Sequence, residues 1–263
     1  MANSKLLINP ASIVRALATT AFVLVLLSIA AVSADGLTEH NSVILHKAVK
    51  FFYVDFELNA PSFFSTLILL IASAILAVIT ILKRQQKDLY TAEWAVLSIG
   101  FLAMSFDELL SVHERMIEPM QELLGNKNLG IFYFAWVIPM GILVLLLAVF
   151  FLRFWWNLPP KTRLHFMIAG ALFLGGAVGL ELFESKHSEI YGIDTLTYIV
   201  LVTIEESLEM TGVIIFIKAL FTYIKETFGE LQLQLDNSQC ESGLLALRKV
   251  KQDQLIGVSQ KSA

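Results

Sequence analysis

Six stretches of about 20 mostly apolar residues run through this chain and constrain its fold more than any other feature. A helix of about 20 residues is long enough to cross the hydrocarbon core of a bilayer. Only 16% of the residues are charged, against roughly 25% in a soluble domain. The sequence therefore predicts an all-α polytopic membrane helical bundle of six transmembrane helices, at 14–34, 62–82, 92–113, 130–152, 164–184 and 195–224.

Lysine and arginine set the predicted orientation, because positively charged connections stay on the cytoplasmic side. Most of the 19 lysines and arginines lie before the first span, between the second and third, between the fourth and fifth, and after the sixth. Both termini are therefore expected to be cytoplasmic. Residues 1–224 are predicted to form the six-span domain with an outer loop at 35–61, and residues 225–263 a cytoplasmic polar tail.

The beginning of the chain allows a second interpretation. Lys5 and Arg15, followed by an apolar run and the small residues at 31–34, resemble a cleavable signal peptide. Removal of residues 1–34 would leave five spans without inverting the others. The apolar run is longer than the roughly 7–15 residues usual for such a segment, which favours six spans.

Charge and cysteine content exclude several classes of protein. The formal net charge of −4 argues against nucleic-acid binding. The single cysteine, Cys240, excludes an internal disulfide framework and a thiolate metal site made by this chain alone. The expected partners are the lipid bilayer and, as one alternative, a membrane partner subunit; the sequence does not identify a substrate.

Carboxylates and histidines are concentrated on three of the six predicted spans. An ionisable group inside a bilayer costs about 2.5–3.5 kcal/mol even on lenient scales, so such groups face a bundle interior or a water-filled cavity and are usually functional. The third, fifth and sixth spans are therefore expected to line the interior. Their candidate residues are Asp107, Glu108, His113 and Glu114 on the third span, Glu181, Glu184 and His187 on the fifth, and Glu205, Glu206 and Glu209 on the sixth.

The predicted orientation places these three groups at a similar depth. Counted along each helix from its predicted side, all of them fall in the outer half of the bilayer. Just before the second span, on the same side, come three further candidates in the outer loop, namely Asp55, Glu57 and Asn59. We expect a polar chamber that opens outward.

So many acids at one depth require a positive partner. Like charges and desolvation both oppose the ionised form, so either protons or metal ions must be present. Hard divalent cations prefer carboxylate and imidazole ligands, and iron, manganese or zinc would suit this set. A carboxylate di-metal bundle uses two Glu-x-x-His motifs, of which this chain offers one at Glu184 and His187. The preferred ligands are Glu108, His113, Glu181, Glu205 and Glu209.

Small residues on the fifth span predict a close helix contact. Ala171, Gly175 and Gly179 follow one another at intervals of one turn. Such a stripe lets another helix approach closely. We interpret it as packing.

Several of these motifs together are similar to a group of uncharacterised bacterial multi-pass membrane proteins. The resemblance covers roughly residues 40–224 and implies a location in the bacterial inner (cytoplasmic) membrane, without implying an activity. The motifs that carry it are Phe106-Asp107-Glu108 with His113-Glu114, Leu180-Glu181, Glu205 through Gly212, and the upstream Asp55, Glu57 and Asn59.

Three hypotheses for function follow. The first is a metal-binding membrane protein, with metal-dependent oxidoreductase activity on a small or lipid-like substrate as its enzymatic form. The second is a transporter for protons or divalent cations. The third is a non-enzymatic accessory or sensor subunit that binds a cationic ligand. The apolar inner halves of the third and fifth spans disfavour transport, and the sequence leaves open whether the protein is an enzyme.

Overall fold

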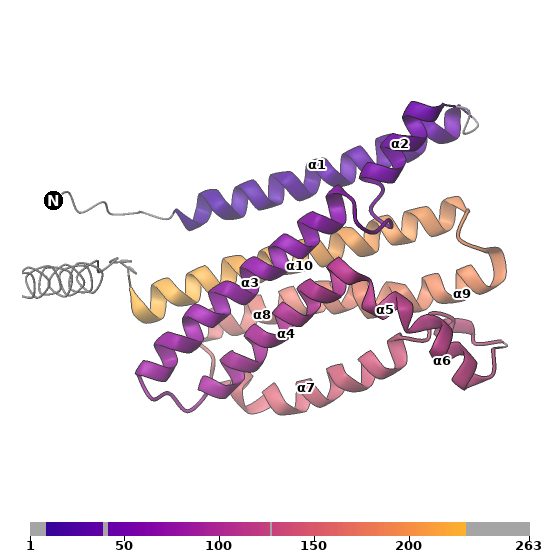
Figure 1. Cartoon of the computed structure of the whole chain (residues 1–263). Coiled ribbons are helices and arrows are strands. Elements are labelled where there is room, and N and C mark those ends of the chain that lie inside the picture. The colour runs from indigo at the N-terminus through magenta and orange to yellow at the C-terminus, as the bar shows by residue number, and fades with distance from the viewer. Residues whose placement is uncertain (1–8, 39–41, 127, 230–263) are drawn as a thin grey trace, which may run out of the picture. The chain divides into compact units, whose positions relative to one another are not determined.

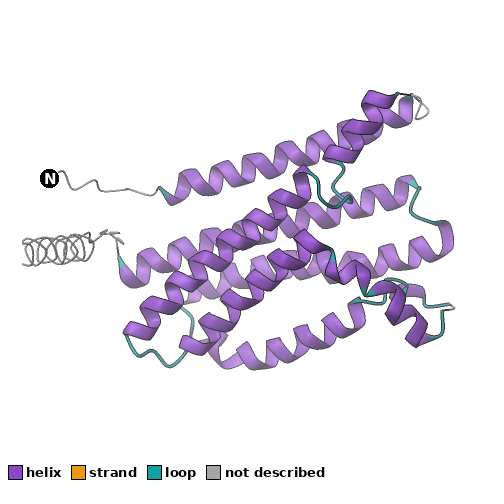
Figure 2. Ribbon diagram, viewed as in Figure 1, coloured by secondary structure: helices purple, strands orange, loops and turns teal. Residues whose placement is uncertain are grey.

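The computed structural model describes residues 9–38, 42–126 and 128–229, and every regular element in these ranges is a helix (Figure 1, Figure 2). The prediction of an all-α fold is confirmed. The predicted polar tail falls largely on residues 230–263, outside the described part of the chain, as does Cys240.

The long helices begin where the sequence supplies a capping side chain. Asn9 accepts hydrogen bonds from the first turn of α1 (Pro10–Leu37), and Asn59 accepts one from Ser62 at the start of α3 (Ala60–Gln85). Thr195 does the same for α10 (Leu196–Phe228). These side chains satisfy backbone N–H groups that a helix leaves unpaired. The remaining elements are α2 (Val43–Phe52), α4 (Thr91–Leu110), α5 (Val112–Arg115), α6 (Ile117–Leu124), the short 3-10 turn η1 (Gly130–Phe132), α7 (Val137–Asn157), α8 (Pro160–Leu174), the π-helical turn η2 (Gly175–Leu180) and α9 (Glu181–Tyr191).

Helix α10 lies at the centre of the packing. It contacts α1, α3, α8, η2 and α9, while α3 packs along α4. Its side chains Ile217 and Leu220 are fully buried against others such as Ile68, Leu76 and Ile79 of α3. The opposite pattern holds on α7, where large apolar side chains remain exposed, as expected for a surface that faces lipid.

Four helical runs are long and apolar enough to cross a membrane. They are α1, α3, α7 and the continuous run Pro160–Tyr191, which joins α8, η2 and α9. Helix α4 with the short helices that follow it makes a fifth if the bent pair is counted as one span. The structure thus supports four or five of the six predicted spans by length and composition, and α10 is not among them.

The third predicted span is not one straight helix to residue 113. It breaks at Ser111, which has left-handed backbone angles of φ 49° and ψ 48°, and the helical pieces on either side are bent by 69°. The Asp107 carboxylate accepts the backbone N–H of His113 at 2.9 Å, so a side chain replaces a helical hydrogen bond there. The prediction of one continuous span to residue 113 is therefore wrong, and Asp107 and Glu114 lie on different helical pieces.

The fourth predicted span starts later than expected, at Val137 instead of residue 130. The Glu189 carboxylate of α9 accepts the backbone N–H groups of Leu129 and Gly130, at 2.7 and 2.8 Å. These two bonds hold Leu129 and the start of the short 3-10 turn η1 where the hydrophobic pattern suggested a continuous α-helix. A tertiary contact that periodicity does not encode thus displaced the predicted boundary.

The two ends of the helices differ in charge. The start of α1, the α3–α4 and α7–α8 connections and the end of α10 lie together at one end, at the left of Figure 1. The sequence places many cations there, including Lys83, Arg84, Lys87, Lys161 and Lys225. The acid-bearing α5 and α9 lie toward the opposite end.

Candidate metal centre

Three glutamates from two helices lie close together. One carboxylate oxygen from each of Glu181, Glu184 and Glu205 lies within 4.8 Å of the others. Glu184 is 1% exposed and Glu205 is 6% exposed. Within the described ranges, this is the group of acid, histidine or cysteine side chains whose geometry suits a metal ion.

A π-helical turn positions the two glutamates of α9. Residues Gly175–Leu180 widen the helix just before Glu181, and π-turns of this kind occur frequently at functional sites. At Gly176, an added Cβ would lie 2.9 Å from the backbone oxygen of Glu205 and 3.1 Å from Cγ of Glu209. The absence of a side chain at Gly176 therefore lets η2 approach the acid-bearing turns of α10.

This contact corrects the predicted small-residue stripe. A Cβ added at Gly175 would meet nothing within 4 Å beyond the neighbouring turns of its own helix backbone, and one added at Gly179 would meet only the carbonyl oxygen of Leu174. The close approach is made instead by Gly176 and, from the other helix, by Gly212. The wide turn shifts the angular register of the helix, so counting in steps of 3.6 residues selects the wrong face.

The negative charge of the cluster must be offset by protons or by a bound cation. Two unit charges at 4 Å repel by about 4 kcal/mol even at an effective dielectric constant of 20. Oε1 of Glu184 is buried and has no hydrogen-bond partner among the described residues. A buried, unpartnered carboxylate oxygen beside two more carboxylates has the chemistry of a hard-cation ligand. The residues present therefore fit a divalent metal.

Trp136 links this cluster to the third predicted span. Its indole Nε1–H donates to Oε1 of Glu181 at 2.8 Å, and its ring lies 4.8 Å from the His113 imidazole, centroid to centroid. Nδ1 of His113 lies 2.8 Å from Oδ2 of Asp107. A carboxylate on one ring nitrogen orients a histidine and leaves Nε2 for another partner, an arrangement common beside metal sites. Asp107, His113, Trp136 and Glu181 thus form one chain of contacts.

The break at Ser111 explains how His113 reaches this position. In a straight helix the residue would be turned away from Asp107, whereas the left-handed turn brings the imidazole back over the Asp107 carboxylate. The same break leaves Glu114 exposed. Of the predicted His113-Glu114 pair, His113 is therefore half-buried against Asp107, whereas Glu114 is exposed and its charge still acts on Asp55 and Glu57.

The remaining acids of α4 and α10 form a neighbouring group. Glu108, Glu206 and Glu209 are partly buried and interact electrostatically with one another. Glu209 also interacts with Glu181, Glu184 and His113. These acids lie next to the three-glutamate cluster, but their carboxylate oxygens are not part of the group in which all ligand atoms lie within 4.8 Å of one another.

His187 has a different environment. Its Nε2 lies 2.6 Å from the Thr195 hydroxyl, and its ring packs on Tyr191. This contact joins the end of α9 to the start of α10. The structure does not group His187 with Glu184, although the two have the Glu-x-x-His spacing.

The three predicted outer-loop candidates have two kinds of role. Asn59 stabilises the local fold, whereas Asp55 and Glu57 interact with other charged groups. Asn59 is buried, caps α3 and donates to the Tyr53 carbonyl at 2.6 Å. The Tyr198 hydroxyl donates to Oδ1 of Asp55 at 3.1 Å. Burial raises the pKa of the Asp55 carboxyl from 3.8 to about 6, and the charges of Glu114 and Glu181 act in the same direction, against the Tyr198 hydrogen bond.

Glu57 belongs to the same loop and faces the break in the third span. Burial raises the pKa of the Glu57 carboxyl, and the negative charge of Glu114 adds to this, while His113 and hydrogen bonds with Ser111 and Ser62 oppose it. Asp55 and Glu57 therefore connect the loop electrostatically to the acids of the interior.

Sequence reasoning missed two residues of this site. Trp136 follows no acidic motif and its indole N–H is useful only because the chain folds it onto Glu181. Tyr198 lies at the start of α10, where its hydroxyl partner comes from a loop 143 residues earlier. Neither partnership leaves a local signal in the sequence.

Fold and site together define a protein whose described residues form only helices, several of them apolar and suited to a membrane, with a carboxylate cluster between two of these helices. The chain belongs to a family described as a domain of unknown function (DUF8692), which matches residues 14–224. The matched range contains every residue of the cluster. No curated protein and no solved structure matches the chain.

Proposed function

We propose that this chain is a multi-pass membrane protein that binds a divalent metal ion, iron, manganese or zinc, through Glu181, Glu184 and Glu205. The observation that carries the proposal is the buried Oε1 of Glu184, which lacks a hydrogen-bond partner in the described structure and lies beside two other carboxylates. Asp107, His113 and Trp136 would then form the surrounding shell that orients the ligands.

In this proposal α10 is the sixth span. It is 33 residues long, and the interior acids that lower its apolar character face other helices, as intramembrane acids do. The cation-rich end of the bundle would be cytoplasmic, with both termini on that side. A hydrogen bond from the Val54 N–H to the buried Ser28 hydroxyl ties α1 to the loop before α3, which supports a first helix that is retained. The resemblance noted for the sequence suggests the bacterial inner membrane.

A transporter is disfavoured by the residues on the cytoplasmic side of the acids. After Glu209, helix α10 continues with buried apolar side chains, among them Val213, Phe216 and Ile217. A transported proton or cation would need polar groups there. The described residues of α10 offer no such path beside these side chains, so a fixed metal site agrees better with the packing.

The identity of the metal selects the class of reaction. Iron and manganese support oxidation and reduction, whereas zinc acts as a Lewis acid. Metal-dependent oxidoreductase activity is the enzymatic form of this proposal, and its first requirement is a redox-active metal at the cluster.

Elemental analysis of detergent-purified protein tests the proposal. We expect about one or two equivalents of metal per chain, lost in Glu184→Gln and in Glu205→Gln and retained in the control Glu122→Gln, whose side chain is exposed. Absence of metal from the wild type, even after reconstitution with each ion, would contradict the proposal. Equal metal in all variants would show that the cluster is not the binding site.

A further inference from the structure

An apolar cavity lies between α4, α7, α8 and α10, on the side of the acid cluster toward the cation-rich end. Its volume is about 320 Å³, and its walls include Phe101, Phe154, Phe173 and Phe216. A dry apolar cavity of about 150 Å³ is already large enough to bind benzene. This cavity can therefore hold a substantial length of hydrocarbon.

The cavity exists because α7 stands apart from its neighbours. Helix α7 makes few close backbone contacts with the other helices, whereas α8 and α10 pack tightly. Aromatic rings from α4 and α10 line the space behind it, with Phe101 and Phe216 stacked at 4.7 Å. In a bilayer, such a space behind a lipid-facing helix is accessible to hydrocarbon chains.

A polar cavity adjoins the apolar one at the end of the bundle. It has a volume of about 200 Å³ and is lined by Lys83, Asp88, Tyr90 and Asn157, together with Trp94 and Phe154. Phe154 lines both cavities, and its ring contacts the Trp94 ring at 5.0 Å. The Phe154 side chain therefore forms part of the wall of both the polar and the apolar cavity.

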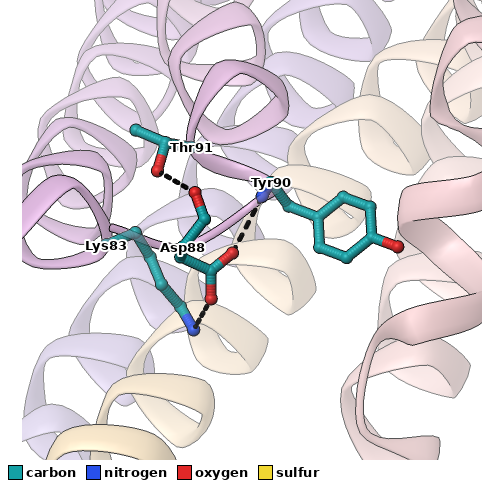
Figure 3. Close-up of polar contacts among 4 residues, drawn as sticks. All are labelled: Lys83, Asp88, Tyr90 and Thr91. Atoms are coloured by element: carbon teal, nitrogen blue, oxygen red, sulfur yellow. Dashed lines mark hydrogen bonds and ion pairs between the residues drawn. The ribbon is translucent and has the colours of Figure 1, made fainter. Parts of the chain in front are cut away.

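The polar cavity carries no net charge on its lining. Nζ of Lys83 lies 2.9 Å from Oδ2 of Asp88, and the other Asp88 oxygen accepts the Tyr90 N–H, as Figure 3 shows. These are the two charged residues among those that line it. A neutral head that exchanges hydrogen bonds suits this lining better than an anion.

The two cavities follow one another from the end of the helices toward the interior. The polar cavity lies at the α3–α4 and α7–α8 connections, where the helices end, and the apolar cavity extends inward to Gly212 and Phe173. Gly212 is three residues, or about 4.5 Å of helix, beyond Glu209. The apolar cavity therefore ends about one turn from the acid-bearing part of α10.

We propose that the two cavities together bind a membrane amphiphile with one long hydrocarbon chain and an uncharged hydrogen-bonding head. The head lies beside Lys83, Asp88 and Tyr90, and the chain lies in the apolar cavity with its end toward Glu209. This site is separate from the glutamate cluster and does not require a metal there.

Tryptophan fluorescence provides the test. Of the four tryptophans, Trp94 is 1% exposed and lines the polar cavity, so bulk lipid does not contact it. Replacing Trp136, Trp155 and Trp156 by Phe leaves Trp94 as the only emitter. A monoacylglycerol brominated on its acyl chain should quench this emission saturably, whereas a brominated two-chain phosphatidylcholine should not.

Two glycines supply a blocking variant and its matched control. Gly170 lines the apolar cavity, and Gly100 lies on the exposed face of α4; an added Cβ at either position would meet no atom within 4 Å beyond the neighbouring turns of its own helix backbone. In the Trp94-only background, Gly170→Leu should weaken quenching by about tenfold or more, because the new side chain occupies the cavity. The emission of Gly100→Leu should be quenched to the same extent as that of the Trp94-only parent.

The outcomes separate this inference from the proposed metal site. In the Trp94-only background, Glu205→Gln should bind the brominated monoacylglycerol unchanged. Gly170→Leu made in the wild-type protein, where Trp136 is retained, should keep its metal and its unfolding temperature. No saturable quenching in the parent, or equal quenching in both glycine variants, would overturn the proposal. Tighter binding of a brominated fatty-acid anion than of the monoacylglycerol would refute the uncharged head.

Discussion

Replacement of Gly212 by alanine should separate the two most closely packed helices near the site. A Cβ at this position would lie 2.9 Å from the carbonyl oxygen of Ala169 and 2.9 Å from the backbone nitrogen of Phe173. Both atoms belong to the backbone of α8, so no side-chain rotation can relieve the contact. One of the two helices must move.

The expected magnitude follows from two opposing effects. Overpacking a well-packed interior costs typically about 1–3 kcal/mol. Alanine in place of glycine within a helix stabilises the helix by about 0.8–1.0 kcal/mol. We therefore expect Gly212→Ala to be destabilised relative to the wild type by up to about 2 kcal/mol. The matched control is Gly170→Ala on α8, which has open space at Cβ and should be unchanged or slightly stabilised.

Thermal unfolding in detergent measures this difference. For a chain of this size, 1 kcal/mol corresponds to roughly 2–4 °C. The two variants share the gain from alanine and differ by the overpacking cost of about 1–3 kcal/mol, so Gly212→Ala should unfold about 2–12 °C below Gly170→Ala. A Gly212→Ala protein that unfolds at or above the temperature of Gly170→Ala would refute the close approach of α8 and α10. It would also remove the explanation for the position of η2 beside the acids.

The remaining predictions concern the metal centre and the outer loop. Gly176→Ala should lower metal content, because its Cβ would push η2 from the acid-bearing turns of α10; metal analysis checks this. Trp136→Phe removes the donor to Glu181 and should weaken metal binding by about 10–100-fold, measured by competition with a chelator. The Asp55 carboxyl, with its pKa near 6, should titrate higher in Tyr198→Phe, as followed by its infrared carbonyl band. Because the pKa of Asp55 is raised on folding, its contribution to stability should be present below pH 3.8 and lost as the pH rises through about 6.

Two outcomes would contradict the predictions for Trp136 and Tyr198. A Trp136→Phe protein with wild-type affinity would mean that the indole is only a packing group. For the loop, a Tyr198→Phe protein whose Asp55 titration is unchanged would mean that the 3.1 Å contact does not form in the membrane.

Local pattern was enough to predict the helices. Apolar runs of about 20 residues have few stable arrangements, and the helical bundle and the ranges of α1, α3 and α10 agree with the sequence within a few residues. The concentration of acids on three segments also follows from the sequence, because burying a charge is costly enough to make each such position informative.

The sequence predictions failed at two places where the backbone departs from a regular α-helix. Ser111 adopts a left-handed conformation that no repeat predicts, and it moves His113 onto Asp107 while Glu114 is exposed. The π-turn before Glu181 likewise moved the close helix contact from Gly175 to Gly176.

By itself, then, the sequence determined an all-α chain with apolar helices and an acid-rich interior, because hydrophobic period and charge burial are properties of single segments. Only the tertiary structure decided that Glu181, Glu184 and Glu205 meet, that Trp136 binds one of them, and that two cavities share Phe154. These contacts depend on the angle and register between helices, which are set by packing at positions such as Gly176 and leave no periodic trace in the chain.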